Sequence, residues 1–134
     1  MKLYILAGED SGDLHASKLM AALRKERSDW EFRGIGGDKM LAEGLEHVAH
    51  IKDVNFMGFF EVVQHLGTIR KLFKTVKEDL VSWKPDAVVL VDYPGFNLRL
   101  AKWAKEEGYK VIYYIAPQAW AWKENRVEKL KAYT

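Results

Sequence analysis

The 134-residue chain contains no cysteine, which excludes disulfide bonds, thiol nucleophiles and thiolate metal sites. This absence fits a reducing compartment, so the cytoplasm is the default expectation. Long apolar runs are missing too. The run after Lys2 ends at Ala7, short of the apolar core of a signal peptide, and the stretch 87–91 is far below the ~18 to 20 residues of a spanning helix. Any membrane role is therefore expected at the bilayer surface.

The chain also lacks a clear excess of charge. Its 21 basic and 19 acidic side chains give a formal net charge of +2 with the signs mixed, so we expect no nucleic acid partner. Neither G-x-G-x-x-G nor a Walker A motif is present, which removes the main support for dinucleotide or P-loop nucleotide binding. His47 and His50 are close in sequence, but no cysteine or carboxylate cluster completes a ligand set. We expect no metal and no cofactor.

The sequence does contain a regular alternation of short apolar segments and amphipathic helices. The predicted strands are 3–7, 31–35, 48–51, 86–91 and 110–115, and helices are expected after Asp13 and over 38–43, 59–80 and 97–108. Strands separated by helices favour right-handed parallel crossovers. The pattern predicts one α/β domain over 1–134, a Rossmann-like open parallel sheet with helices on both faces.

The end of the sequence suggests a truncated domain. A last helix is expected to begin at Lys123, and no Gly, Pro or polar tail closes it before Thr134. Removing part of a domain exposes apolar surface, and large exposed patches favour association. We therefore expect the chain to form homodimers or larger species.

Three loops rich in glycine or polar groups follow predicted strands, at 8–13, 34–38 and 92–97. Parallel strands bring such loops to one rim of the sheet, where ligands bind in open α/β folds. Glycines let the backbone approach a ligand, and the helix N-terminus after Ser11 offers N–H groups to an anion such as a sugar phosphate. The alternative is that Ser11 and Asp13 only cap the first helix. The ligand-binding candidates of the first two loops are Gly8, Glu9, Ser11, Gly12, Asp13, Gly36 and Gly37.

Asp92 stands at the rim end of the fourth predicted strand, which is otherwise apolar. Its position favours a general base that takes a proton from a substrate hydroxyl, a role typically worth about 10² to 10⁴ in rate. The alternative is a turn residue before Pro94. Asn97 is expected to cap the following helix, with substrate contact as its alternative, and Glu9 is either a second rim carboxylate or a solvated charge.

An aromatic loop follows the fifth predicted strand and contains Gln118, Trp120 and Trp122. Aromatic side chains either stack on a ligand or fill a core or domain interface, and both interpretations stay open here. Gln118 and Trp120 are kept as candidates for substrate binding.

The segment 56–80 is apolar at its start and basic further on. The helical stripe over 66–80 is expected to be core. The apolar excess at 59–63 is harder to bury on one face, and four cations follow it within 70–77. This pattern is typical of an interfacial helix on an anionic membrane. The expected membrane-contact residues are Phe59, Phe60, Val62, Val63, Leu66, Arg70 and Lys71.

Five motifs occur together and in order, at 7–15 (AGEDSGDLH), 34–37 (GIGG), 56–62 (FMGFFEV), 92–97 (DYPGFN) and 117–122 (PQAWAW). Together they resemble the lipid-A-disaccharide synthase family over essentially the whole chain.

The chain departs from the family pattern at three positions. The family often has Asp-Ala-Pro-Asp-Phe-Asn where this chain has Tyr93 and Gly95, and often Ser where Ala116 stands. The first Asp of the motif, Asp92, is retained, so the proposed base survives.

The resemblance implies an inverting GT-B glycosyltransferase of Gram-negative bacteria, built from two Rossmann-like domains and bound peripherally to the cytoplasmic side of the inner membrane. It would join UDP-2,3-diacylglucosamine to 2,3-diacylglucosamine 1-phosphate in lipid A biosynthesis. This chain resembles the acceptor-side, N-terminal domain, with Asp92 matching the base for the acceptor 6-hydroxyl. The uridine nucleotide would bind a second domain that this chain lacks, so the chain alone is expected to be inactive. The resemblance implies no metal, and the family's membrane contact coincides with the helix begun at Met57.

Two alternatives of other classes stay open. A UDP-sugar epimerase-like domain shares the architecture but handles soluble sugars, so it would not need the apolar excess at 59–63. A noncatalytic membrane-surface binding module would use that excess but would not need Asp92 as a base.

Overall fold

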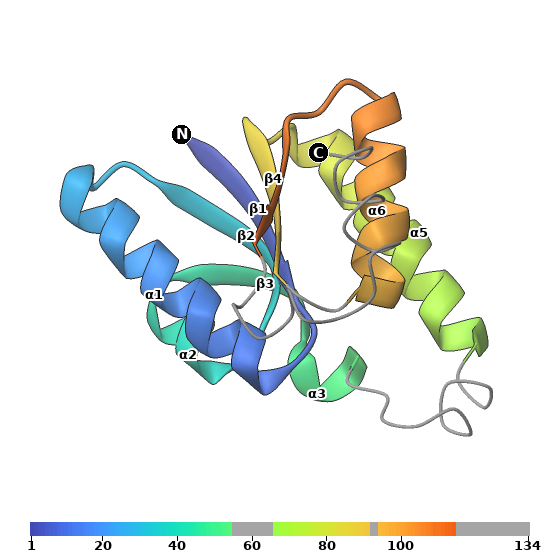
Figure 1. Cartoon of the computed structure of the whole chain (residues 1–134), viewed down its shortest axis with the longest axis horizontal. Coiled ribbons are helices and arrows are strands. Elements are labelled where there is room, and N and C mark those ends of the chain that lie inside the picture. The colour runs from blue at the N-terminus through green and yellow to red at the C-terminus, as the bar shows by residue number, and fades with distance from the viewer. Residues whose placement is uncertain (55–65, 92–93, 115–134) are drawn as a thin grey trace, which may run out of the picture.

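The computed structural model describes residues 1–54, 66–91 and 94–114 (Figure 1). Their centre is a five-stranded parallel sheet in the order β3-β2-β1-β4-β5. The strands are β1 (Lys2–Ala7), β2 (Glu31–Gly36), β3 (Leu45–His50), β4 (Ala87–Val91) and β5 (Val111–Tyr114). The predicted Rossmann-like parallel sheet is confirmed.

Helices cover both faces of this sheet, as Figure 1 shows. One face carries α1 (Asp10–Glu26) and α2 (Asp38–Ala42), and the other carries α5 (Leu66–Trp83) and α6 (Pro94–Glu106). A short α3 (Ile51–Val54) follows β3 directly. Each face of the sheet is therefore shielded by its own helical layer.

The side chains of the central strands divide between these two layers, because successive residues of a strand point to opposite faces. Leu3 and Ile5 of β1 pack in the core under α1, whereas Tyr4 and Leu6 pack in the core under α5 and α6. Every residue of β4 is buried, which is typical of a parallel strand covered on both faces. Each fully buried Leu or Ile side chain contributes about 1.5 to 3 kcal/mol, so the two layers hold the sheet firmly.

A partly buried polar cluster ties β2 to α5. Arg33 Nε and Nη2 donate to the two carboxylate oxygens of Asp79 at 2.7 and 2.8 Å, and Arg33 Nη1 lies 2.7 Å from Glu46 Oε1. Burial is the largest influence on the pKa of Asp79 and by itself would raise it, but the hydrogen bonding and charge of Arg33 together with the contribution of Tyr4 lower that pKa below its ordinary value. Burial and, to a smaller extent, the charge of Asp79 raise the pKa of Tyr4. Tyr4 of β1 lies opposite Arg33 of β2 in the parallel register.

The third strand is displaced from its predicted place. β3 runs over Leu45–His50 rather than 48–51, and Ile51 begins α3 instead of ending the strand. Gly44 takes a φ of +97°, a left-handed conformation that lets the chain turn sharply after α2 and begin pairing with β2 at Leu45.

Two helices begin earlier than the sequence suggested. α1 begins at Asp10 rather than after Asp13, and α6 begins at Pro94 rather than at Asn97. Proline suits the first position of a helix because its fixed φ is already helical and its missing N–H would lack a partner there. The expected helix from Lys123 lies outside the described residues, as does the part of the 59–80 helix before Leu66.

Candidate functional site

The order of the strands creates a switch point between β1 and β4. The chain adds β2 and β3 on one side of β1, then returns to add β4 and β5 on the other. In open α/β sheets, ligands bind outside the carboxyl ends of the strands at such a point. The last residues of the two strands, Ala7 and Val91, are partners in the parallel register. The carboxyl ends of β1 and β4 therefore lie side by side.

Asp92 is the residue that follows Val91, and it lies outside the described residues. Its role as general base stays a prediction. The described neighbour Val91 is fully buried at the carboxyl end of β4.

Asn97 links the two strands of the switch point through its side chain. Its side chain is fully buried in α6, and its Nδ2 donates to the carbonyl oxygens of Leu6 and Val91, each at 3.4 Å. The prediction that Asn97 caps its helix is wrong, because Pro94 starts α6 and places Asn97 inside the first turns. The amide instead bridges β1 and β4 at the rim.

A shallow recess opens beside this bridge, with about 190 Å³ of empty space that includes space open to solvent. Its lining residues are Leu6, Ala7, Gly8, Ile35, Leu72, Phe96 and Asn97. The wall is almost entirely apolar, because Asn97 is the single polar side chain among these residues. The sequence did not reveal this recess, because Leu72 and Phe96 carry no polar signal and come from helices far apart in the chain.

Asp13 connects the two glycine loops of the rim. Its buried carboxylate accepts hydrogen bonds from three backbone N–H groups, those of Gly37 at 2.9 Å, Lys39 at 3.1 Å and Met40 at 2.9 Å. The alternative that Asp13 caps the first helix is therefore wrong, because its carboxylate bonds to the loop before α2 and to the start of α2. The N-cap residue of α1 is Glu9, whose side chain does not cap the helix, and Asp13 caps the start of α2.

The glycines next to Asp13 are required by close packing. A Cβ on Gly37 would lie 2.6 Å from Asp13 Oδ2, and a Cβ on Gly12 would lie 3.2 Å from the Cβ of Ala7. Both distances are tighter than ordinary contact, so the loop of β2 and the first turn of α1 approach as closely as they do because these side chains are absent.

The rim candidates of the first two loops thus come together, as the sequence predicted. Glu9 and Ser11 are exposed on it, whereas Gly8, Gly12, Gly36 and Gly37 are buried against the strand ends. Contact between any of these residues and a substrate stays a prediction. The candidates Gln118, Trp120, Phe59, Phe60, Val62 and Val63 lie outside the described residues.

An Asp–His pair stands at the edge of this rim and was not found from the sequence. His50 Nε2 lies 3.0 Å from Asp38 Oδ1, and His50 Nδ1 accepts the N–H of Lys52 at 3.1 Å. The hydrogen bond from His50 lowers the pKa of Asp38. Both ring nitrogens are engaged, and within residues 1–54, 66–91 and 94–114 no group of three acidic, His or Cys side chains is placed to hold a metal ion.

The predicted membrane-contact residues fall mostly before the described part of α5. Leu66 begins that helix, and Arg70 and Lys71 are exposed in its first turns. Within the described helices, none has the length and apolarity needed to cross a bilayer.

Comparison with known proteins decides the family. The family model for lipid-A-disaccharide synthetase matches residues 3–134. The chain belongs to the lipid-A-disaccharide synthetase family. The resemblance drawn from the five motifs is confirmed, and the match includes every loop of the rim.

Individual members of the lipid-A-disaccharide synthetase family are similar along almost the whole chain. Lipid-A-disaccharide synthase 1 of Legionella pneumophila (strain Lens) is 44% identical over 131 residues, which is 97% of this chain and 34% of that protein. The lipid-A-disaccharide synthases of Myxococcus xanthus and Chromohalobacter salexigens are 43% and 38% identical over 130 residues, with the same coverage. The chain thus spans about a third of the length of the curated relatives it matches.

Proposed function

We propose that this chain is the acceptor-side, N-terminal domain of a lipid-A-disaccharide synthase, a GT-B glycosyltransferase of Gram-negative bacteria. The observation that carries the proposal is the pairing of Ala7 with Val91, which brings the carboxyl ends of β1 and β4 to one edge of the sheet beside the first glycine loop. The family match and the names of the relatives give the reaction class. The proposed substrates are UDP-2,3-diacylglucosamine and 2,3-diacylglucosamine 1-phosphate.

In the proposed reaction, Asp92 acts as general base on the acceptor. It takes the proton of the 6-hydroxyl while that oxygen forms a bond to the anomeric carbon of the donor. The bond from the anomeric carbon to UDP breaks, UDP leaves with the electron pair, and the configuration inverts. The N-terminal turn of α1 supplies N–H groups suited to the acceptor phosphate. The scheme uses no metal and no cofactor.

The donor nucleotide is proposed to bind a second domain outside this chain. The chain spans 34% of the length of its relatives, and its described rim lacks a nucleotide-phosphate motif. We therefore expect the chain alone to form no disaccharide, and turnover by the isolated chain would refute this part of the proposal.

The decisive experiment uses a chimera in which this chain replaces the aligned third of the Legionella pneumophila relative. The unsubstituted chimera should form the disaccharide, and Asp92→Asn should lower kcat by about 10² to 10⁴. Asp86→Asn is the matched control, because Asp86 is an exposed carboxylate at the opposite end of β4, where it accepts the N–H of Lys2 at 2.7 Å. Equal activity of the Asp92 and Asp86 variants would rule out Asp92 as the base.

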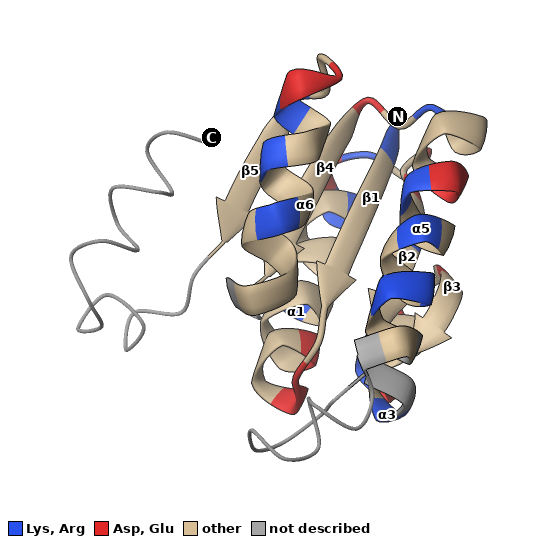
Figure 2. Ribbon diagram, turned by 90° about the vertical axis from the view of Figure 1, so that its right-hand side faces the viewer, with Lys and Arg blue, Asp and Glu red and all other residues tan. Residues whose placement is uncertain are grey.

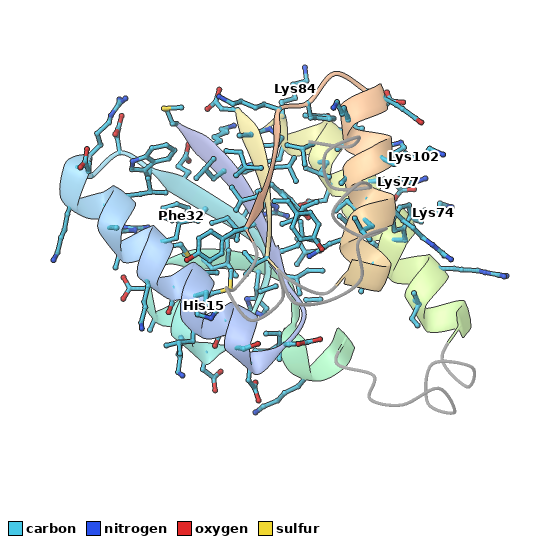
Figure 3. The ribbon with its side chains drawn as sticks, in the orientation of Figure 1. His15, Phe32, Lys74, Lys77, Lys84 and Lys102 are labelled. Carbon is cyan, nitrogen blue, oxygen red and sulfur yellow. The ribbon has the colours of Figure 1, made fainter. Side chains whose placement is uncertain are left out.

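The chain is further proposed to contact an anionic membrane from the cytoplasmic side, through the apolar segment 59–63 and the outer face of α5 and α6. Figure 2 shows basic residues along both helices on one side of the domain. Lys74, Lys77 and Lys102 extend together from that side in Figure 3. Lys77 Nζ lies 5.0 Å from the ring centre of Phe73 and 5.7 Å from that of Trp103, so it joins the two helices.

The basic face formed by Lys74, Lys77 and Lys102 supports a membrane partner, because few acidic side chains in the described part of the chain neutralise its charge. Glu78 lies 4.0 Å from Lys74 with both side chains exposed, an arrangement worth little in water. Basic residues near an anionic bilayer contribute about 1 kcal/mol each. Vesicles containing phosphatidylglycerol should therefore bind the chain, and binding should weaken with salt, whereas neutral phosphatidylcholine vesicles should bind less.

A further inference from the structure

The first turn of α1 touches all three described strand ends that form the rim. Gly12 packs against Ala7 at the end of β1, and a Cβ built on it would lie 3.5 Å from Val91 Cγ1 at the end of β4. The next residue, Asp13, reaches the loop after β2 through its three backbone hydrogen bonds. One helical turn therefore contacts the ends of β1 and β4 and the loop after β2.

The Asp13 carboxylate has little capacity left for a ligand. An ionised carboxylate offers roughly four acceptor positions, and three are occupied by backbone N–H groups. The residue is only 6% exposed, so a sugar hydroxyl or phosphate has no open approach to it. The N–H groups that it holds belong to the start of α2, where a negative charge is favoured.

From this geometry we infer that Asp13 is a positioning residue for the acceptor site, which acts by fixing the Gly36–Gly37 loop against the ends of β1 and β4. The inference rests on the proposed glycosyltransferase function. Asp13 touches neither the substrate nor the reacting atoms. Its effect on turnover passes through the loop, whose backbone lies at the rim beside the loop that begins at Gly8.

The Gly37 backbone makes the role specific to Asp13. Because a Cβ at residue 37 would meet the Asp13 carboxylate at 2.6 Å, the loop approaches the acid this closely only with glycine at residue 37. Asp13→Asn keeps the shape but replaces one acceptor oxygen by an NH2 group, which faces backbone N–H donors and cannot accept from them. The loop should loosen without a cavity being formed.

The first experiment measures amide hydrogen exchange in the 134-residue chain. In Asp13→Asn, exchange at Gly37, Lys39 and Met40 should quicken relative to the sheet amides of β1 and β4. The control is Asp79→Asn, which removes another carboxylate that accepts two hydrogen bonds, from Arg33 on the other face of β2. That control should leave the loop amides unchanged. Equal exchange at the loop in the Asp13 variant and the unsubstituted chain would overturn the inference.

The second experiment measures KM and kcat in the Legionella chimera. A misplacement of about 1 Å can cost about 10²-fold in rate, so Asp13→Asn should lower kcat/KM by roughly 10-fold to 100-fold, mainly through a higher KM for the acceptor. Asp79→Asn, compared at equal folded fraction, should leave KM unchanged. The same KM change in both variants would mean that Asp13 only stabilises the fold, and it would overturn the inference. An inactive unsubstituted chimera would count against the proposed function alone, and the exchange measurement would then decide the role of Asp13.

Discussion

Arg33 and Asp79 form a two-pronged ion pair across the space between β2 and α5, with both guanidinium-to-carboxylate hydrogen bonds at 2.8 Å or shorter. This pair is the main polar link between the sheet and the α5 layer among the described residues. Removing Asp79 leaves the partly buried guanidinium of Arg33 with two unmet hydrogen bonds and, within the described part of the chain, only the exposed Glu46 as a partner. We expect Asp79→Ala to lower the free energy of unfolding by about 3 kcal/mol, measured by urea denaturation.

A control for this prediction comes from the surface. Asp29 pairs with Arg27 at 2.7 Å, but both side chains are more than half exposed. Asp29→Ala should change the unfolding free energy by less than about 1 kcal/mol. Similar losses in the two variants would contradict the structural importance of the Arg33–Asp79 pair.

The Arg33–Asp79 pair should also make the free energy of unfolding depend on pH in the acid range. The pKa of Asp79 is lower in the folded chain than its ordinary value of 3.8, so the folded state favours the ionised form. Its contribution is fully present above pH 3.8 and is lost as the pH falls through the lower, folded-state pKa. Urea midpoints measured downward from neutral pH should show a smaller loss in this acid window for Asp79→Asn than for the unsubstituted chain. Parallel curves would contradict the prediction.

The bridge made by Asn97 predicts a second stability effect. Asn97→Ala leaves the carbonyl oxygens of Leu6 and Val91 without their buried amide donor, which should cost about 1 to 3 kcal/mol of unfolding free energy. In the chimera the variant should also lower turnover, because it releases the two strand ends at the rim. Ser82→Ala, an exposed change at the far end of α5, is the control and should be neutral.

The basic face predicts a charge-dependent membrane affinity. Replacing Lys74 and Lys102 by Gln should weaken binding to phosphatidylglycerol vesicles by about 1 kcal/mol for each charge. The matched control replaces Lys18 and Lys25, two exposed lysines of α1 on the opposite face of the sheet. Sedimentation of vesicles at low and moderate salt measures both. Equal weakening by the two pairs would indicate nonspecific attraction rather than an oriented face.

Self-association of the chain is the fifth prediction. Ile112 and Tyr114 of β5 remain 44% and 40% exposed, an apolar pair on one outer strand of the described sheet. Light scattering of the chain should show dimers or larger species at high concentration, and Ile112→Thr with Tyr114→Ser should shift them toward monomer. A clean monomer for the unsubstituted chain would refute the expectation.

The sequence predicted the parts of the fold that rest on apolar pattern. β1, β2 and β4 are continuous apolar or alternating runs, and each was located to within a residue at either end. β3 was misplaced because Leu45–His50 mixes two histidines and a glutamate with few apolar residues, and its position depends on the turn at Gly44 and on pairing with β2.

The candidate site was predictable only as a rim. Loop composition was enough to predict that the loops after β1 and β2 meet, but the partners of Asp13 lie 24 to 27 residues further along the chain, and no local spacing identifies them. Asn97 was expected to cap its helix because asparagine favours that position, but α6 begins three residues earlier, at Pro94. Contacts between distant segments were thus the missing information.

The alignment of Ala7 with Val91 makes the length of two strands decide which residues reach the rim of the sheet. One residue inserted into β1 or β4 would slide the following loop by about 3.3 Å and reverse the faces of the shifted side chains. A substitution at the same place changes only one side chain. Insertions and deletions within these strands are therefore the changes that this architecture should tolerate least, even where every residue at the rim is kept.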